Sequence, residues 1–342
     1  MVVLGTLAVA DASAPQALAY FDDSLYFVKQ QAIWAVIGII AMIVVSRFDY
    51  KIWQKWAIPL FWISIICLVI VLIPGIGTKA LGARRWISLG PIGFQPSELV
   101  KLATAVYFAT LAQSQKSVKT YAILLAAIAG LIMLQPDLGT TLIISGIGFI
   151  QMFIAGVPIL SMIGVVGSGV VGALVLILSS TYRRERLMTF LLGHETGALD
   201  TGYHISQVLI ALGSGGLFGV GLGQGRQKYL FLPEAATDSV FAVLAEEIGF
   251  VGCILLVSLF ILFIMRGLRV ARLAPDRFGT MLAVGIIAWL ATQFFLNLSS
   301  MLSLTPLTGV PLPFFSYGGS SLTMILVGVG ILLSISRHAK TT

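Results

Sequence analysis

Asp238 is the one aspartate in the segment 228–249 (KYLFLPEAATDSVFAVLAEEIG), whose polar loop lies in a chain that is otherwise dominated by apolar runs. Asp238 precedes one of these runs, so it is suited to capping the helix that we expect to begin near Ser239. The positive end of a helix also keeps a carboxylate ionised, and an ionised carboxylate can act as a general base. Helix cap and base are both open interpretations, and one residue can serve as both.

A second group of charged residues lies in the segment 82–101 (GARRWISLGPIGFQPSELVK). Glu98 and Lys101 are three residues apart, so they share one face of a predicted helix. A lysine close to lipid is costly unless it is paired, which predicts either a structural ion pair or part of a phosphate-binding site. Arg84 and Arg85 are interpreted either as arginines that reach the membrane interface or as phosphate ligands.

Two shorter motifs add polar candidates. Asp137, in QPDLGT, is suited to capping the helix that follows it, or to facing the same site as Asp238. The segment 305–321 (TPLTGVPLPFFSYGGSS) has three prolines and two adjacent glycines, which predict a rigid, non-helical loop. Its hydroxyls, including those of Ser316 and Ser320, could contact a ligand, and a purely structural re-entrant loop is the alternative.

The elements that must position these residues are membrane helices. The mean hydropathy is +1.00, 58% of the residues are hydrophobic and 10% are charged. Several apolar runs approach the ~20 residues that span a bilayer, which predicts an all-α, polytopic membrane protein with a single domain over 1–342. We expect ten spans. Nine cover 30–46, 57–74, 98–112, 120–134, 138–154, 159–179, 246–265, 279–300 and 319–336, and residues 1–10 are expected to be the end of a tenth.

The short loops predict the orientation of the chain. Lysines and arginines concentrate in alternate loops, which are therefore expected to be cytoplasmic. The opposite, extracytoplasmic face then carries the large loop 180–245, with short amphipathic helices predicted over 182–192 and 203–212. The net charge of +7 is scattered over loops, which argues against nucleic-acid binding. His194 and His204 have no companion ligands at suitable spacing, so no structural metal site is predicted.

Four of these segments, in order along the chain, resemble the SEDS family (shape, elongation, division and sporulation proteins). The resemblance is carried by 82–101, 135–140, 231–252 and 305–321, and it extends over the chain after the first span. Members of this family polymerise the glycan strand of peptidoglycan from lipid II. The resemblance implies a lipid II-dependent glycosyltransferase in which Asp238 is the residue on which polymerisation depends.

The resemblance also explains why one carboxylate could be enough. Glycoside hydrolases need an acid as well as a base or nucleophile, because an alcohol is a poor leaving group. Lipid II instead releases a lipid diphosphate, which departs as a stable anion once cations neutralise it. The implied site therefore needs one base, together with Lys or Arg side chains or a divalent cation such as Mg²⁺ or Mn²⁺. An α-linked donor that becomes a β-1,4 bond implies a single in-line displacement.

The family further implies partners and a location. These are lipid II, the nascent glycan strand, a class B penicillin-binding protein (a transpeptidase) and other elongation-complex proteins, at the bacterial inner membrane. Within the family we favour the elongation branch, typified by RodA and concerned with cell shape, over the division branch, typified by FtsW. The rival function is a lipid II flippase, which should show repeats or broken helices at mid-membrane. A non-catalytic scaffold would leave the outer carboxylate unexplained.

Overall fold

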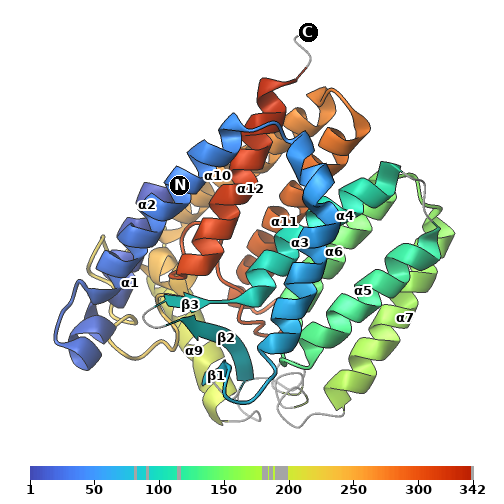
Figure 1. The fold of residues 1–342 in the computed structure, drawn as a ribbon. Coiled ribbons are helices and arrows are strands. Elements are labelled where there is room, and N and C mark those ends of the chain that lie inside the picture. Colours follow the sequence, from blue (N-terminus) through green and yellow to red (C-terminus); the bar gives the residue numbers. More distant parts are fainter. Residues whose placement is uncertain are drawn as a thin grey trace. The chain divides into compact units, whose positions relative to one another are not determined.

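The computed structural model describes residues 1–80, 83–89, 92–113, 117–178, 184, 188 and 199–339. Helices make up most of it (Figure 1). They are α1 (Val2–Phe21), α2 (Tyr26–Arg47), α3 (Lys51–Ile70), α4 (Pro96–Gln113), α5 (Val118–Met133), α6 (Leu138–Ile154), α7 (Ile159–Leu178), α9 (Leu199–Ser214), α10 (Val240–Leu273), α11 (Arg277–Met301) and α12 (Gly319–Arg337).

Length and hydropathy of the helices agree with a membrane protein. In the described part of the chain, six helices are long and apolar enough to cross a bilayer, namely α1, α2, α3, α10, α11 and α12. Shorter apolar stretches occur in α5, α6 and α7. Every predicted span overlaps a helix, although the span 57–74 extends past the end of α3 and the span 246–265 is only part of α10. The all-α, polytopic class is confirmed.

The first helix is longer than expected. The sequence predicted an apolar stretch only over 1–10, which is too short to span a bilayer and was expected to be the end of a helix. In the structure α1 continues to Phe21 and carries Asp11 and Pro15 in its interior. Asp11 can lie in this helix because its carboxylate binds the ammonium group of Lys228, so the charge is compensated.

A small sheet occupies the loop 75–97 between the predicted spans 57–74 and 98–112, where no strand was predicted. Strands β1 (Gly77–Ala80), β2 (Ala83–Leu89) and β3 (Ile92–Phe94) form an antiparallel sheet in the order β1-β2-β3 (Figure 1). Its register pairs Thr78 with Trp86 and Ile87 with Phe94. Successive side chains of a strand point to opposite faces, so β2 directs Arg84 and Arg85 to different sides.

The described residues group into two compact units. Unit 1 comprises 1–36, 174–263 and 293–319, and unit 2 comprises 37–173, 264–292 and 320–342. Unit 2 has an apolar core of α3, α4, α5 and α6 that includes Leu68, Phe108 and Ile128. In unit 1 the rings of Phe260 and Phe294 stack with their centroids 4.2 Å apart.

Helix α10 begins two residues after Asp238 and is interrupted at Gly249, whose φ of 66° is left-handed. A Cβ at Gly249 would lie 2.2 Å from the backbone nitrogen of Gly219, so no side chain fits there. The amphipathic helix predicted over 203–212 is α9. The one predicted over 182–192 lies outside the described residues, except for Arg184 and Met188.

Candidate functional site

The carboxylate and ammonium groups predicted to pair on α4 form a buried ion pair in unit 2. The Nζ of Lys101 lies 2.7 Å from Oε1 of Glu98, and the two side chains are only 1% and 3% exposed. The same Nζ lies 5.5 Å from the ring centroid of Trp289, a distance at which a cation and an aromatic face attract each other. Their spacing on a helix brings the two charges together. Because both side chains are buried, removing either one would leave the other as an uncompensated buried charge.

Three buried polar atoms of α4, one of them in this pair, have unused hydrogen-bonding capacity. Oε2 of Glu98 and the hydroxyls of Ser97 and Thr104 are buried and have no hydrogen-bond partner among the described residues. Buried polar groups are normally hydrogen-bonded, so this cluster has the capacity to bind further donors, such as water or ligand hydroxyls. The cluster on α4 is therefore a polar site inside an otherwise apolar unit.

Arg85 and Asp137 have structural contacts of their own in unit 2. The guanidinium group of Arg85 donates a 3.0 Å hydrogen bond to the carbonyl of Gln135 and another to that of Pro136. The carboxylate of Asp137 accepts hydrogen bonds from the backbone nitrogen (2.9 Å) and the hydroxyl (2.8 Å) of Thr140. Asp137 therefore caps α6, as the first of its two interpretations expected. Arg84 lies on β2 and is partly exposed.

Asp238, in unit 1, is half-buried, and α11 and the loop 302–318 contact it or the residue before it. The amide of Asn297, on α11, donates a 2.8 Å hydrogen bond to the carbonyl of Asp238. The loop 302–318 supplies Gly309, where an added Cβ would lie 3.2 Å from Oδ2 of Asp238. The preceding carbonyl, of Thr237, accepts a hydrogen bond from the hydroxyl of Ser316.

The two serines of the predicted loop differ in their settings. The hydroxyl of Ser316 donates to Thr237 and accepts a 2.7 Å hydrogen bond from the backbone nitrogen of Leu312, so it fixes the loop to the segment before α10. Ser320 is in unit 2, in the first turn of α12. Its hydroxyl is buried without a hydrogen-bond partner in the described part of the chain. Of the two, Ser320 has the hydroxyl with unused hydrogen-bonding capacity.

Two glutamates of α10 hold the glycine-rich loop 215–227. Both oxygens of Glu247 accept backbone hydrogen bonds, from Gly223 (3.0 Å) and Gly225 (3.1 Å). The two carboxylate oxygens of Glu246 accept hydrogen bonds from the backbone nitrogens of Arg226 (2.9 Å) and Gln227 (3.1 Å). Oriented backbone N–H groups of this kind can bind an anion, but here the protein's own carboxylates occupy them. The loop is therefore no phosphate-binding loop.

A buried lysine completes this arrangement. The Nζ of Lys228 lies 2.7 Å from Oε1 of Glu247 and 2.5 Å from Oδ1 of Asp11. Burial by itself lowers the pKa of Lys228, but the two carboxylates outweigh burial and raise the pKa above its ordinary value. One ammonium group thus ties together α1, α10 and the start of the segment that leads to Asp238.

Sequence reasoning missed the contacts of Lys228 and Asn297. Both carried a signal, because a polar side chain within or beside an apolar helix requires a partner. Asp11 in the first helix and Asn297 in the expected span 279–300 are such residues. The sequence indicated that each has a partner without indicating which one.

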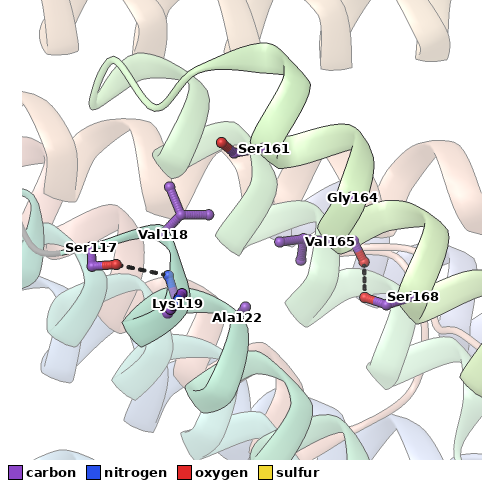
Figure 2. A pocket seen from close by; sticks show the side chains of 8 residues that line it. All are labelled: Ser117, Val118, Lys119, Ala122, Ser161, Gly164, Val165 and Ser168. Atoms are coloured by element: carbon purple, nitrogen blue, oxygen red, sulfur yellow. Dashed lines mark hydrogen bonds between the residues drawn. The ribbon is translucent and has the colours of Figure 1, made fainter.

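A separate cleft of 440 Å³ lies in unit 2 between α5 and α7 (Figure 2). Lys119 and Ala122 line it from α5, and Ser161, Gly164 and Ser168 line it from α7. None of the predicted site residues lines this cleft. Among the described residues, no group of three or more His, Cys, Asp or Glu side chains could hold a metal ion.

Together, the apolar helices, the buried ion pair and the loop-bound carboxylate define a polytopic membrane protein with polar sites built into its helical units. The family model described as a cell cycle protein, of the FtsW/RodA/SpoVE type, matches residues 1–341. The chain belongs to this family, the SEDS family predicted from its motifs.

Individual relatives agree with this assignment. Stage V sporulation protein E of Bacillus subtilis (strain 168) is 43% identical, covering 99% of this chain and 95% of its own. A probable peptidoglycan glycosyltransferase FtsW of Trichlorobacter lovleyi is 40% identical, covering 98% of this chain and 90% of its own. A solved peptidoglycan synthase complex, described as coordinating polymerization and crosslinking, contains a chain that is 28% identical, with a TM-score of 0.80 and coverage of 100% and 98%. The protein is a membrane-embedded glycosyltransferase.

Proposed function

We propose that this enzyme polymerises lipid II into the β-1,4-linked glycan strands of peptidoglycan, at the outer face of the bacterial inner membrane, with Asp238 as general base. The observation that carries the proposal is the setting of Asp238. Its carboxylate is half-buried at the start of α10, and Asn297 hydrogen-bonds its backbone carbonyl. The helix start favours the ionised form that a base requires.

The proposed reaction is one displacement. A hydroxyl oxygen of the acceptor sugar attacks the anomeric carbon of the donor, and its proton passes to the carboxylate of Asp238. The bond between the anomeric carbon and the diphosphate oxygen breaks, and both of its electrons leave with the lipid diphosphate. In-line attack inverts the configuration, which converts an α-linked donor into a β-linked product. No acid is needed, because the leaving group departs as an anion.

Neutralising that anion is the proposed role of the cationic side chains. Lys101, held by Glu98, is the first candidate, and Arg84 and Arg85 are the others, since guanidinium groups suit phosphate oxygens. Asp137, Ser316 and Ser320 are further proposed substrate contacts. Ser320 is supported by its unpartnered hydroxyl in the described structure.

A divalent cation such as Mg²⁺ or Mn²⁺ is also proposed. Mg²⁺ is commonly held by one or two carboxylates together with substrate phosphates. The described residues offer single carboxylates, Asp238 and Glu98, and no larger cluster, which suits a cation carried mainly by the diphosphate. When bound, it would supply positive charge to the leaving group.

The proposed partner is a class B penicillin-binding protein, supported by the likeness to a peptidoglycan synthase complex. Within the family, the elongation branch remains a prediction, while the Bacillus and Trichlorobacter relatives carry sporulation and division names. Depletion of the protein in its own cells distinguishes the branches. Round cells would support a role in elongation together with other elongation-complex proteins, and filaments would overturn it in favour of division.

The test of the base uses purified protein and labelled lipid II. Asp238→Asn keeps the size of the side chain but cannot accept the proton, so polymerisation should fall by the ~10²–10⁴-fold typical of a lost base. Glu234→Gln is the matched control. It makes the same carboxylate-to-amide change in the same segment, at an exposed position whose carboxylate binds only the hydroxyl of Thr237 in the described structure.

Both variants should insert and fold like the parent. Near-normal polymerisation by Asp238→Asn would overturn the assignment of the base. Transport provides a separate outcome. Wild-type protein that moves labelled lipid II across vesicle membranes, yet forms no glycan polymer with any class B partner, would overturn polymerisation in favour of the flippase.

A further inference from the structure

Three successive backbone carbonyls lead into α10, and each has a donor within unit 1. The carbonyl of Ala236 accepts a 2.8 Å hydrogen bond from the backbone nitrogen of Tyr317, and the carbonyl of Thr237 accepts one from the hydroxyl of Ser316. The carbonyl of Asp238 accepts a 2.8 Å hydrogen bond from the side-chain amide of Asn297. The backbone that carries the Asp238 side chain is thus fixed at every residue from 236 to 238.

Asn297 differs from the other two donors because they belong to the loop 302–318, whereas Asn297 lies on α11 and binds both this loop and the segment before α10. Its amide nitrogen donates both of its hydrogens, one to the carbonyl of Asp238 and one to that of Val310, each at 2.8 Å. Val310 follows Gly309, where an added Cβ would lie 3.2 Å from Oδ2 of Asp238. A single side chain on α11 therefore links the backbone of Asp238 directly to the part of the loop that borders its carboxylate.

The identity of the side chain matters at this position. Asn297 is fully buried, and its amide oxygen has no hydrogen-bond partner in the described residues. Rotating the amide by 180° would aim that oxygen at two carbonyl oxygens, so only the orientation with the nitrogen between them is favourable. Leucine has a similar size but no donor, and aspartate would place negative charge against the same two carbonyls.

We propose that Asn297 is a positioning residue for the transfer reaction, holding the backbone of Asp238 in register with the loop at 309–310. The inference rests on the proposed role of Asp238 as base. A displacement of the order of 1 Å at a catalytic group can cost about 10²-fold in rate. The loss should therefore appear in kcat, while KM for lipid II stays close to that of the parent.

Gln293 provides a matched control one turn earlier on α11. It is equally buried, and its amide donates a 2.9 Å hydrogen bond to the carbonyl of Pro311 in the same loop. Gln293→Met and Asn297→Leu both remove a buried amide of α11 that holds this loop. Asn297→Leu also removes the hydrogen bond to the carbonyl of Asp238.

The experiment is a double-mutant cycle on the purified full-length protein, measuring kcat and KM for lipid II polymerisation. Asn297→Leu should lower kcat by about 10²-fold, and Gln293→Met by less than about tenfold, with similar effects on thermal stability. In the Asp238→Asn background, Asn297→Leu should cause little further loss, because residues that act through one group are non-additive. A purely structural role would lower the rate by the same factor in both backgrounds.

The outcomes separate the inference from the function on which it rests. A parental kcat for Asn297→Leu, an undiminished effect in the Asp238→Asn background, or an equal loss for Gln293→Met overturns the role of Asn297. A parental rate for Asp238→Asn alone overturns the proposed base. If Asn297→Leu does not fold, Asn297→Ser, which keeps one donor on a shorter side chain, takes its place with the same criteria.

Discussion

Two ion pairs in this protein have the same nitrogen–oxygen distance, but one is buried and the other is exposed. Comparing them measures the energetic effect of burial. Lys228 and Glu247 are 2.7 Å apart, with side chains 3% and 1% exposed. Lys29 and Asp23 are also 2.7 Å apart, with side chains 63% and 38% exposed. Replacing each lysine by methionine removes one charge and preserves most of the side-chain length.

The loss of unfolding free energy expected for Lys228→Met comes from the two carboxylates that remain without their cation. Glu247 keeps its hydrogen bonds to Gly223 and Gly225, but its charge and that of Asp11 lose their shared cation. Removing one partner of a buried pair typically costs 3–5 kcal/mol, so we expect a loss of about 4 kcal/mol in the free energy of unfolding. Lys29→Met should cost only a small fraction of this, because solvent screens the exposed pair.

The measurement is unfolding of the purified variants in mixed micelles by titration with a denaturing detergent. Adding Asp11→Asn to Lys228→Met should recover part of the loss, because one of the two uncompensated charges disappears. If Lys228→Met costs no more than Lys29→Met, or if the second substitution recovers nothing, the reasoning from buried charge is wrong.

Lys228 also predicts the direction of a pH effect. Its pKa is raised in the folded protein by Asp11 and Glu247, so its contribution to stability is complete below the ordinary lysine pKa of about 10.4. That contribution is lost as the pH rises from there through the folded value. The difference in unfolding free energy between the parent and Lys228→Met should therefore shrink at alkaline pH, and a difference that grows would contradict the assignment.

Three further predictions concern the remaining site residues. Glu98→Gln or Lys101→Met should each strongly impair folding or polymerisation. A Glu98→Lys, Lys101→Glu double variant that folds without polymerising would indicate that Lys101 contacts substrate. Single variants with parental folding and activity would refute the pairing. Asp137→Ala should lower stability by about 1 kcal/mol through loss of the helix cap, and Asp137→Ser should retain most of it. Gly309→Ala should lower the polymerisation rate, since φ there is 69° and the new methyl group would crowd the candidate base, whereas Gly130→Ala, with no atom within 4 Å, should not.

Local patterns in the sequence were enough to predict the helices and the contacts made within a single helix turn. Apolar runs of sufficient length located the spans, because a bilayer accepts only backbone whose hydrogen bonds are satisfied internally. The pairing of Glu98 with Lys101 and the cap that Asp137 forms on α6 were predictable for the same local reason. Each involves residues three apart, whose relative positions a helix fixes.

Contacts between distant segments decided what the local patterns left open. The sequence predicted an apolar stretch that stops before Asp11, and the partner that stabilises this carboxylate, Lys228, is 217 residues away. It predicted no strand where β1–β3 form, since short strands have little signal before they pair. The contacts of Arg85 with the carbonyls of residues 135 and 136 could likewise not be predicted from the sequence.

The same distinction holds at the candidate site. The sequence by itself predicted that Asp238 lies at the start of an apolar helix, because composition and helix signals are properties of neighbouring residues. Only the tertiary structure decided that Asn297, 59 residues further along the chain, holds the backbone of Asp238, and that Glu246 and Glu247 bind the glycine-rich loop. A buried amide or carboxylate must find a partner, but the chain's path through space determines which one.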